Sequence, residues 1–347
     1  MTFLQAIWWI SIFMATLSVF IMTGLILRRL VIQRRKIWWD TRKKELTGVV
    51  FGHIEDPTSI SAIKGSFSEM DMRLINEIAH DLMNTVSGTT KSNLLTLLVN
   101  VGGLESAISA VRSNNERQRF NAIDNLVLFD DPKAINVLLE VLDDPYPRIR
   151  LAAAGVLVKK DIYISVSKLI NKLSVDSGIR PRLLREVFRK IAPSSVDEIL
   201  EILRADAPES VRELLIDALG AANDYTAVDI LAAEMESSSL NIRAEVMRSL
   251  AAIGHPSALP AVVKGLEDDA WEVRTQAAIC AGRIGLSETL PHLIRLLDDE
   301  QWWSRYRAAG AMIKLGPDGT GKLQEISTGS SPAAEIADLV LAEAKLA

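Results

Sequence analysis

The feature that most constrains the fold is a short motif that recurs at a nearly constant interval along the chain. It is an apolar residue followed by arginine, as in Ile149-Arg150, Ile242-Arg243 and Val273-Arg274. Seven arginines, with two looser copies at the ends, form the evenly spaced series: Arg119, Arg150, Arg180, Arg212, Arg243, Arg274 and Arg305. A period of roughly 31 residues indicates repeated supersecondary units stacked in a row rather than one globular core.

Each repeat is expected to contain two helices. The residue before the arginine and those three, four and seven positions after it are mostly small or apolar, as in the copy at Arg274. These positions make a single stripe along a helix. A second helical segment precedes each one, such as Ala258–Leu266 or Thr289–Leu297, and acidic turns join the two. Seven such helix pairs predict an all-α fold, an α-solenoid.

Three strings carry a resemblance to a known family: LLEVLDDPYPRIRLAAAGVL, GLEDDAWEVRTQAAICAGRIG and LIRLLDDEQWWSRYRAAGAMIKLG. They resemble short bacterial HEAT repeats, the kind also called phycobilisome-lyase HEAT-like. The resemblance covers roughly residues 115–320. It departs at Pro181, which follows Arg180, and at Ser304, where an apolar residue is expected.

The arginine series has two interpretations. The resemblance implies a structural ladder in which the seven arginines pair with aspartates and tie neighbouring repeats together. Acidic residues do precede most of the arginines by five to seven positions. The alternative is a basic ribbon that binds phosphates. However, residues 51–347 carry a net charge of −11, so no nucleic-acid partner is expected.

An aromatic series is the better candidate for partner binding. Trp271 and Trp302 hold the same position in adjacent repeats, and Trp303, Arg305 and Tyr306 extend the patch. Because stacked repeats lie about 10 Å apart, these rings are expected near one another. Trp, Tyr and Arg are frequent anchors of protein interfaces. The alternative is that the tryptophans only begin the second helix and pack locally.

The N-terminal segment 1–27 contains no charged side chain. As a helix, residues 3–27 would be roughly 37 Å long, enough to cross a bilayer core of about 30 Å. Nothing basic precedes the apolar run and RRLVIQRRK follows it, which is unlike a cleaved signal peptide. We therefore expect an uncleaved anchor at 1–27. By the positive-inside rule its N-terminus is outside and the solenoid is cytoplasmic.

Residues 28–46 are expected to form a basic juxtamembrane helix. Its membrane-surface candidates are five basic residues and two tryptophans: Arg28, Arg29, Arg34, Arg35, Lys36, Trp38 and Trp39. The favoured interpretation is that these charges only set the topology. The alternative is binding of anionic lipid, worth about 1 kcal/mol per basic residue near the surface.

The remaining boundaries follow from composition. A linker is expected at 47–66, because Gly48, Gly52, Pro57 and Gly65 interrupt the pattern. A helical N-terminal cap follows at 67–113, with Gly102-Gly103 as a helix stop. The HEAT solenoid occupies 114–330, and a C-terminal capping helix occupies 331–347.

No constellation for catalysis is found, so no enzyme activity, cofactor or metal site is predicted. The four histidines are far apart in sequence, and none has metal-ligand spacing with cysteine or another histidine. Cys280, the single cysteine, lies inside a predicted packed helix, where a structural thiol is expected. Phosphate-loop and nucleophile-elbow motifs are absent from the sequence.

The sequence predicts a non-enzymatic, membrane-anchored scaffold that binds another protein. The anchor, the basic tail, MNTVSGTTKSNLLTLLVNVGGLESAISAVRSN and the repeats together resemble bacterial inner-membrane HEAT proteins associated with exopolysaccharide glycosyltransferases. This implies a membrane-embedded glycosyltransferase as partner. Two alternatives rest on repeat similarity alone: a tetrapyrrole lyase-like protein, or a HEAT-type nucleic-acid-binding protein.

Overall fold

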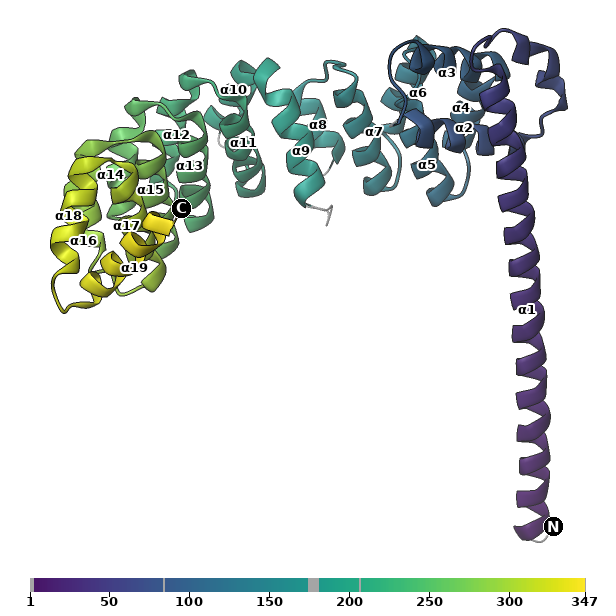
Figure 1. The fold of residues 1–347 in the computed structure, drawn as a ribbon, viewed down its shortest axis with the longest axis horizontal. Coiled ribbons are helices and arrows are strands. Elements are labelled where there is room, and N and C mark those ends of the chain that lie inside the picture. The colour runs from purple at the N-terminus through teal and green to yellow at the C-terminus, as the bar shows by residue number, and fades with distance from the viewer. Residues whose placement is uncertain (1–2, 84, 174–180, 206, 347) are drawn as a thin grey trace. The chain divides into compact units, whose positions relative to one another are not determined.

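The computed structural model describes residues 3–83, 85–173, 181–205 and 207–346. Every regular element within those ranges is a helix, which confirms the all-α prediction (Figure 1). The chain divides into two compact units, Met1–Val137 and Leu138–Ala347. We describe each unit by itself.

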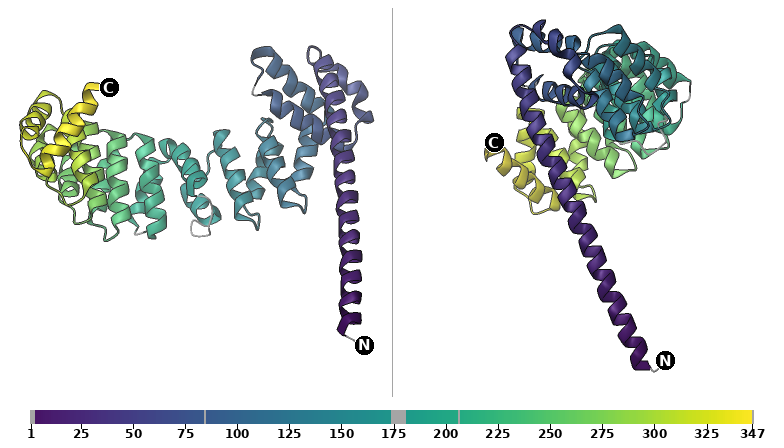
Figure 2. Two further views of the ribbon diagram at one scale, coloured as in Figure 1. Left: turned by 60° about the horizontal axis from the view of Figure 1, so that its bottom comes forward. Right: turned by 90° about the vertical axis from the view of Figure 1, so that its right-hand side faces the viewer.

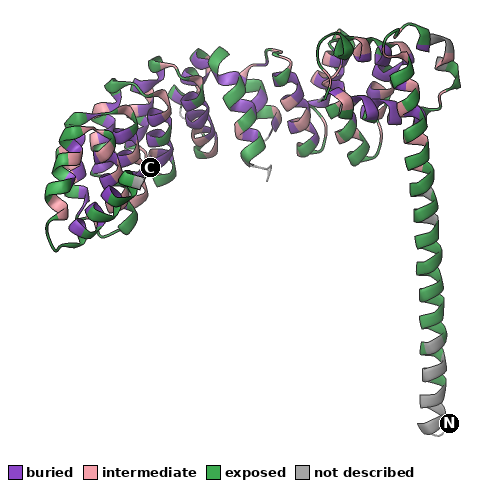
Figure 3. Cartoon of the chain, viewed as in Figure 1, coloured by how far each residue is buried: buried purple, intermediate pink, exposed green. Residues whose placement is uncertain are grey.

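The first unit begins with one long helix, α1 (Phe3–His53). It contains no proline, and the chain turns away only as Pro57 approaches. Its described side chains from Phe13 to Leu30 are exposed, and burial begins only near its C-terminal end (Figure 3). There Leu46 and Val50, one turn apart, are fully buried.

The predicted linker at 47–66 is therefore corrected. Residues 47–53 continue α1, and a 3₁₀ helix, η1 (Ser59–Ser66), follows with Ile60 fully buried. Glycine costs about 1 kcal/mol in a helix interior. Here Gly48 and Gly52 face open space, while Leu46 and Val50 bury their side chains on the other side. Burial of that stripe outweighs the helix-breaking tendency that the sequence pattern suggested.

The remainder of the first unit packs against the end of α1. It contains α2 (Glu69–Met83), α3 (Gly88–Val101), α4 (Gly103–Val111) and α5 (Glu116–Leu126). Gly102 has a φ of 88°, and the chain bends there by 68° between α3 and α4. A left-handed residue of this kind favours glycine. The bend turns both helices so that Leu94, Leu98 and Leu104 are buried.

The second unit is a row of helical hairpins in two layers (Figures 1 and 2). One layer holds α7 (Pro147–Lys159), α9 (Pro181–Ile191), α11 (Glu209–Ala222), α13 (Leu240–Ile253), α15 (Trp271–Ile284) and α17 (Trp302–Lys314). The other holds α8 (Val166–Leu173), α10 (Val196–Arg204), α12 (Val228–Ala233), α14 (Leu259–Leu266), α16 (Leu290–Leu296) and α18 (Pro317–Ser327). The last helix, α19 (Pro332–Leu346), packs on α17 and α18. Helix α6 (Pro132–Val141) begins in the first unit and ends in the second.

Short 3₁₀ turns connect several of these helices in the second unit. They are η2 (Ala192–Ser194), η3 (Tyr225–Ala227), η4 (Glu234–Glu236), η5 (Pro256–Ala258) and η6 (Ser287–Thr289). All but η4 join one repeat to the next, so they lie along one edge of the row. The turns inside the repeats, which carry the acidic residues, lie along the opposite edge.

Small residues let the helices of the first layer approach one another closely. A Cβ atom on Gly220 of α11 would lie 2.9 Å from Ser249 Cα of α13. A Cβ atom on Gly282 of α15 would lie 2.8 Å from Ala311 Cα of α17. Real Cβ atoms do not approach backbone so closely, so a larger residue at either site would push the repeats apart.

Burial corrects the register of the third repeat by one residue. Leu184 and Phe188 are buried, whereas Leu183 is 45% exposed. Leu184 therefore matches Leu215 of the next repeat and Phe188 matches Leu219, which are three and seven positions after Arg212. Counting back, the burial pattern aligns Pro181 with the arginine position of the following repeats, and the ladder role of Arg180 stays a prediction. Arg180 itself lies outside the described residues.

The second departure, Ser304, has a local explanation. Its side chain is fully buried, and its Oγ lies 3.1 Å from Thr275 Oγ1 of the neighbouring repeat. The two hydroxyls satisfy each other, so the apolar stripe tolerates them.

Candidate functional site

Three of the predicted ladder arginines bridge neighbouring repeats. Arg243 Nε lies 2.7 Å from Asp268 Oδ2, and Arg274 Nε lies 2.6 Å from Asp299 Oδ2. Arg212 pairs with Glu234 in the same way. Burial disfavours the charge of Asp268, but the hydrogen bonds from Arg243 and from the backbone of Ala270 outweigh it and lower the pKa of Asp268.

Five arginines of the series also bind the turn of their own repeat through Nη1. Arg274 Nη1 donates to the carbonyl oxygens of Asp268 and Asp269 at 2.8 and 2.9 Å. Arg150 Nη1 reaches the carbonyl of Asp144 at 2.9 Å, and Arg119 Nη1 reaches that of Ser113 at 3.3 Å. Arg243 and Arg274 thus bind the carbonyl oxygens of their own turn and a carboxylate of the next repeat at once.

Arg305 is the last member of the series, and among the described residues it has no carboxylate partner from the following turn. Its Nη1 donates to the carbonyl oxygens of Asp299 and Glu300 at 2.7 and 3.2 Å, like its relatives. Its Nε is buried and has no hydrogen-bond partner among the described residues. Ser330 lies 25 residues after Arg305, the same separation as between Arg243 and Asp268 and between Arg274 and Asp299.

An exposed aromatic cluster lies beside Arg305 on the first two turns of α17. It consists of Trp302, Trp303 and Tyr306. The rings of Trp302 and Tyr306 stack with their centroids 5.0 Å apart, and Trp303 stands edge-on to Trp302 at 4.8 Å. Trp302 remains 41% exposed and Trp303 50% exposed. The Arg307 guanidinium lies 5.5 Å from the centroid of the Tyr306 ring.

A contact from α19 holds this cluster in place. Tyr306 Oη donates a hydrogen bond to Glu343 Oε2 at 2.7 Å, and the carboxylate raises the pKa of Tyr306. Mutual stacking restricts the rotamers of the three rings before any partner arrives. Rigid, exposed aromatic rings lose little entropy on binding, which suits them as interface anchors.

Trp271 does not stack on the rings of the cluster. It begins α15 as Trp302 begins α17, but its side chain is half-buried and makes no ring contact with the other aromatic residues of the described ranges. One repeat separates the two positions, which is too far for direct stacking without an intervening ring. The expectation that Trp271 belongs to the same partner-binding patch stays a prediction.

A second charged network spans α9, α11 and α13. Asp217 accepts hydrogen bonds from both Arg185 and Arg189, at 3.2 Å from Arg185 Nη1 and 2.8 Å from Arg189 Nε. Arg185 also reaches Glu213 at 2.6 Å and Glu245 at 3.3 Å. Asp217 is 6% exposed and Glu245 2% exposed.

The sequence pattern missed this network, because the register that places a charge at an apolar position became clear only from burial. Arg185, in the corrected register, occupies the position held by Ile216 and Met247 in the next two repeats. A charge at an apolar position of a stacked repeat needs a partner from its neighbours.

The predicted membrane-surface residues, which lie on α1 in the first unit, are largely exposed. Arg28, Arg29, Arg34, Lys36 and Trp38 are exposed, Trp39 is half-buried, and the side chain of Arg35 lies outside the described part.

The next basic residues along α1 bind α2 instead. Arg42 Nε lies 2.7 Å from Asp71 Oδ1. Lys43 Nζ lies 2.6 Å from Glu77 Oε1 and 3.1 Å from Asp81 Oδ2. The hydrogen bond from Arg42 lowers the pKa of Asp71 to about 2.

One helix of the described chain is long and apolar enough to cross a membrane. It is α1, whose stretch Thr16–His53 contains a window with a mean hydropathy of 1.5 and no buried share. The bent pair α3–α4 passes the same test of composition, but its Leu94, Leu97 and Leu98 are buried in the packed first unit. An exposed apolar surface as large as that of α1 marks an interaction with a membrane or a protein.

The described residues contain no group of three or more His, Cys, Asp or Glu side chains placed to hold a metal ion. Cys280 is fully buried in α15, and burial raises the pKa of its thiol to about 12. At neutral pH this thiol stays protonated, which makes it a poor nucleophile.

Comparison with known proteins identifies the repeats. The family model for HEAT repeats matches residues 196–280 and 232–314. Together with the helical hairpins, this match confirms HEAT repeats in the C-terminal part of the chain. No curated protein matches the sequence.

Solved structures of low sequence identity are also similar. An engineered protein has 16% identity and a TM-score of 0.40, with 88% of this chain and 99% of that one covered. Kap121p has 12% identity and a TM-score of 0.47, with 87% of this chain covered, and the match spans 42% of Kap121p. Human deoxyhypusine hydroxylase in complex with glycerol has 16% identity and a TM-score of 0.33, covering 79% of this chain and 97% of the enzyme.

Proposed function

We propose that this chain of HEAT repeats is a non-enzymatic, membrane-anchored scaffold. The N-terminal part of α1 spans a bilayer with its N-terminus outside. The repeats lie on the cytoplasmic side and bind another protein through the aromatic cluster of α17. The observation that carries the binding role is the pair Trp302 and Trp303, which are 41% and 50% exposed.

Exposure and charge along α1 support the anchor. The described apolar side chains from Phe13 to Leu27 have no protein neighbours that bury them. At about 25 cal/mol per Å², leaving this much apolar surface in water is costly, whereas a bilayer would cover it. The exposed basic residues that follow support a cytoplasmic location for the solenoid. A bacterial inner membrane is the location that the sequence resemblance implies.

The lipid-facing role of the basic segment is a separate proposal. Arg28, Arg29, Arg34 and Lys36 are exposed and make no ion pair within the described chain. They are therefore available to anionic headgroups, while Arg42 and Lys43 are engaged with α2. The simpler role of these four basic residues is to set the membrane topology, which requires only that they are present.

The partner we propose is embedded in or attached to the same membrane. Anchoring then raises its local concentration around the solenoid, so a modest contact surface is enough. A glycosyltransferase of exopolysaccharide synthesis is the partner class implied by the sequence resemblance. The fold alone does not distinguish it from other membrane proteins.

The test is a crosslinking co-purification from intact cells with a C-terminal tag. The full chain should enrich one membrane protein reproducibly, and Trp302→Ala should reduce that enrichment at least tenfold. Its melting temperature should stay within about 2 °C of the parent, because the ring is nearly half exposed. Tyr225→Ala is the matched control, since Tyr225 is an exposed ring on the opposite edge, stacked on His255.

Two results would count against the proposal. If Trp302→Ala lowers the melting temperature sharply, the ring supports the fold and not an interface. If Tyr225→Ala reduces enrichment as much as Trp302→Ala, the aromatic cluster is not the binding surface.

A further inference from the structure

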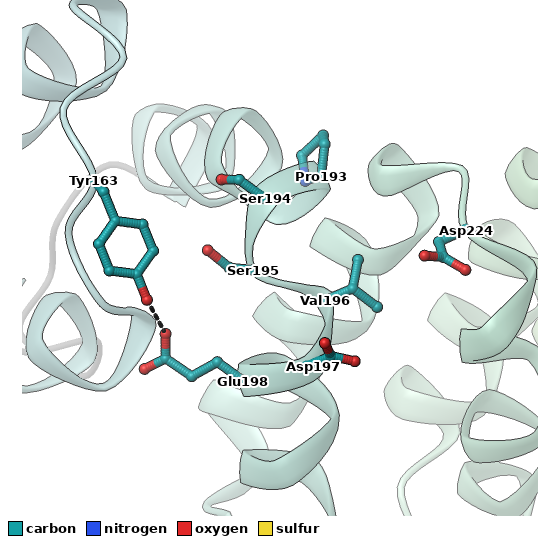
Figure 4. Close-up of a pocket in the computed structure, with 8 residues that line it drawn as sticks. All are labelled: Tyr163, Pro193, Ser194, Ser195, Val196, Asp197, Glu198 and Asp224. Carbon is teal, nitrogen blue, oxygen red and sulfur yellow. Dashed lines mark hydrogen bonds between the residues drawn. The ribbon is translucent and has the colours of Figure 1, made fainter.

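A hollow of about 390 Å³ lies on the edge of the second unit that carries the turns between repeats. Tyr163, Ser195, Asp197, Glu198 and Asp224 are among its lining residues (Figure 4). They come from the turn before α8, the start of α10 and the turn before α12. Three consecutive repeats therefore contribute to one small depression, which lies away from the α17 cluster in sequence and on the opposite edge.

The hollow contains a buried hydroxyl without a partner. Ser195 is 5% exposed, and its Oγ makes no hydrogen bond to any described residue. Ser195 precedes α10, and Glu198 follows three residues later, as in a capping box. In that motif the serine and the glutamate bond reciprocally to each other's backbone.

Here neither half of the box forms, because Ser195 Oγ makes no cap hydrogen bond and the Glu198 carboxylate is used elsewhere. Glu198 accepts hydrogen bonds from the backbone N–H groups of Val166 and Ser167, both at 2.9 Å. Tyr163 Oη donates to the same carboxylate at 3.5 Å. Glu198 thus caps α8 of the preceding repeat, and Ser195 Oγ is left facing the hollow. A buried polar atom without a partner is costly unless something binds it.

The charge around the hollow is negative. Asp197 makes no hydrogen bond or ion pair within the described residues. Asp224 accepts hydrogen bonds from Thr226 Oγ1 and N at 2.7 and 2.8 Å, which lower its pKa. Burial disfavours the charge of Glu198, but the backbone N–H groups outweigh it and lower the pKa of Glu198 as well. No basic residue is among those that line the hollow within the described chain.

We propose that this hollow binds an arginine side chain of a partner protein. A guanidinium has five N–H donors in a fixed plane and no acceptor. Its donors match the acceptors that line the hollow, which include Ser195 Oγ and the carboxylates of Asp197 and Asp224. The exposed Tyr163 ring at the rim provides a face on which the guanidinium plane stacks.

The proposal goes beyond the aromatic cluster and does not depend on it. A partner could use either surface alone, and each has its own variants. The proposed arginine site requires a positively charged ligand, whereas the α17 cluster does not.

The test uses the full chain in detergent micelles and a short fluorescein-labelled peptide of glycine and serine with one central arginine. The control peptide carries citrulline, which has the same shape without the charge. Fluorescence anisotropy should show at least tenfold tighter binding of the arginine peptide. Ser195→Ala should weaken that binding about tenfold, the effect of losing one hydrogen bond to a charged group.

Two matched variants separate the site from general attraction to an acidic protein. Ser194 also lines the hollow, but its Oγ already donates to the carbonyl of Ile191 at 2.9 Å, so Ser194→Ala should change binding less than twofold. Asp197→Asn and Asp229→Asn remove the same charge, and only the former lies in the hollow. Asp197→Asn should weaken binding at least fivefold and Asp229→Asn less than twofold.

The proposal is overturned if the citrulline peptide binds as tightly as the arginine peptide. It is also overturned if Ser195→Ala leaves binding unchanged, which would mean that the hydroxyl meets only water. Equal losses in Asp197→Asn and Asp229→Asn would show attraction by net charge alone. If Ser195→Ala weakens peptide binding but the variant still enriches its membrane partner through Trp302, the arginine site and the scaffold function are independent.

Discussion

At the scale of single residues, the ladder arginines show how one side chain serves two repeats. Arg274 binds two carbonyl oxygens of its own turn through Nη1 and the Asp299 carboxylate through Nε. Such pairs are partly buried and geometrically restrained, so they contribute more than exposed ion pairs. Arg305 keeps the first contact and lacks the second, because the chain offers a serine at the next turn.

Ser330→Asp should therefore complete the ladder. The new carboxylate would follow Arg305 at the same sequence offset at which aspartates follow Arg243 and Arg274. We expect a stabilisation of about 1 kcal/mol, measured as a rise in the chemical-denaturation midpoint. The same change in an Arg305→Ala background should give no gain, and a gain there would show that the aspartate acts through another contact.

At the scale of elements, the attachment of α1 to α2 decides how the proposed anchor connects to the packed helices of the first unit. Arg42 and Lys43 form three ion pairs with α2, and Leu46 and Val50 are buried beneath them. The Gly48 and Gly52 pattern suggested a flexible linker, yet the helix continues through His53. Attachment through a packed helix transmits orientation, whereas a glycine-rich linker would not.

The pairing of Arg42 with Asp71 predicts a pH dependence. The pKa of Asp71 is about 2 in the folded chain, below the value of about 4 expected when unfolded. The pair is therefore fully stabilising above pH 4, and its contribution is lost as the pH falls from about 4 to 2. Because Arg42 is one-third exposed, we expect only about 1 kcal/mol.

Hydrogen exchange of the α1 amides from Arg42 to Val50 measures this contact. Asp71→Asn should speed their exchange about fivefold at pH 6 and remove the acid dependence below pH 4. Glu45→Gln serves as the control, because Glu45 is exposed and pairs with Arg42 within α1. If both variants behave alike, the α1–α2 ion pair contributes nothing measurable.

At the scale of the whole molecule, the proposed anchor and the packed helices are separable in sequence. The described apolar residues from Phe13 to Leu30 are exposed, and burial in α1 begins only at Leu46. Each HEAT hairpin packs mainly on its neighbours, so local truncation leaves distant repeats intact.

Two deletions test this division. Removing residues 1–40 should abolish flotation with liposomes while leaving the melting temperature unchanged, because the ion pairs of Arg42 and Lys43 and the buried Leu46 and Val50 remain. Removing residues 1–53 should also lower the melting temperature, since two buried side chains are lost. Flotation of either deleted chain, or equal melting temperatures, would contradict this division.

The sequence by itself determined the all-α class, the repeat period, the apolar N-terminal helix and the bend at Gly102. These depend on local spacing, because residues three, four and seven apart share a helix face whatever the surroundings. The aromatic patch was predicted from the repeat position that Trp302 shares with Trp271, and Trp303 and Tyr306 were added because they are close in sequence.

Only the tertiary structure decided which side chains meet across repeats. It placed Pro181 at the ladder position of the third repeat, docked Arg42 and Lys43 on α2, and joined Arg185 to Glu245, which lies two repeats further along the chain. It also bonded Glu198 to the preceding repeat, and Ser195 Oγ has no hydrogen-bond partner among the described residues. Such contacts depend on distances between helices that are stacked, and helical periodicity carries no information about those distances.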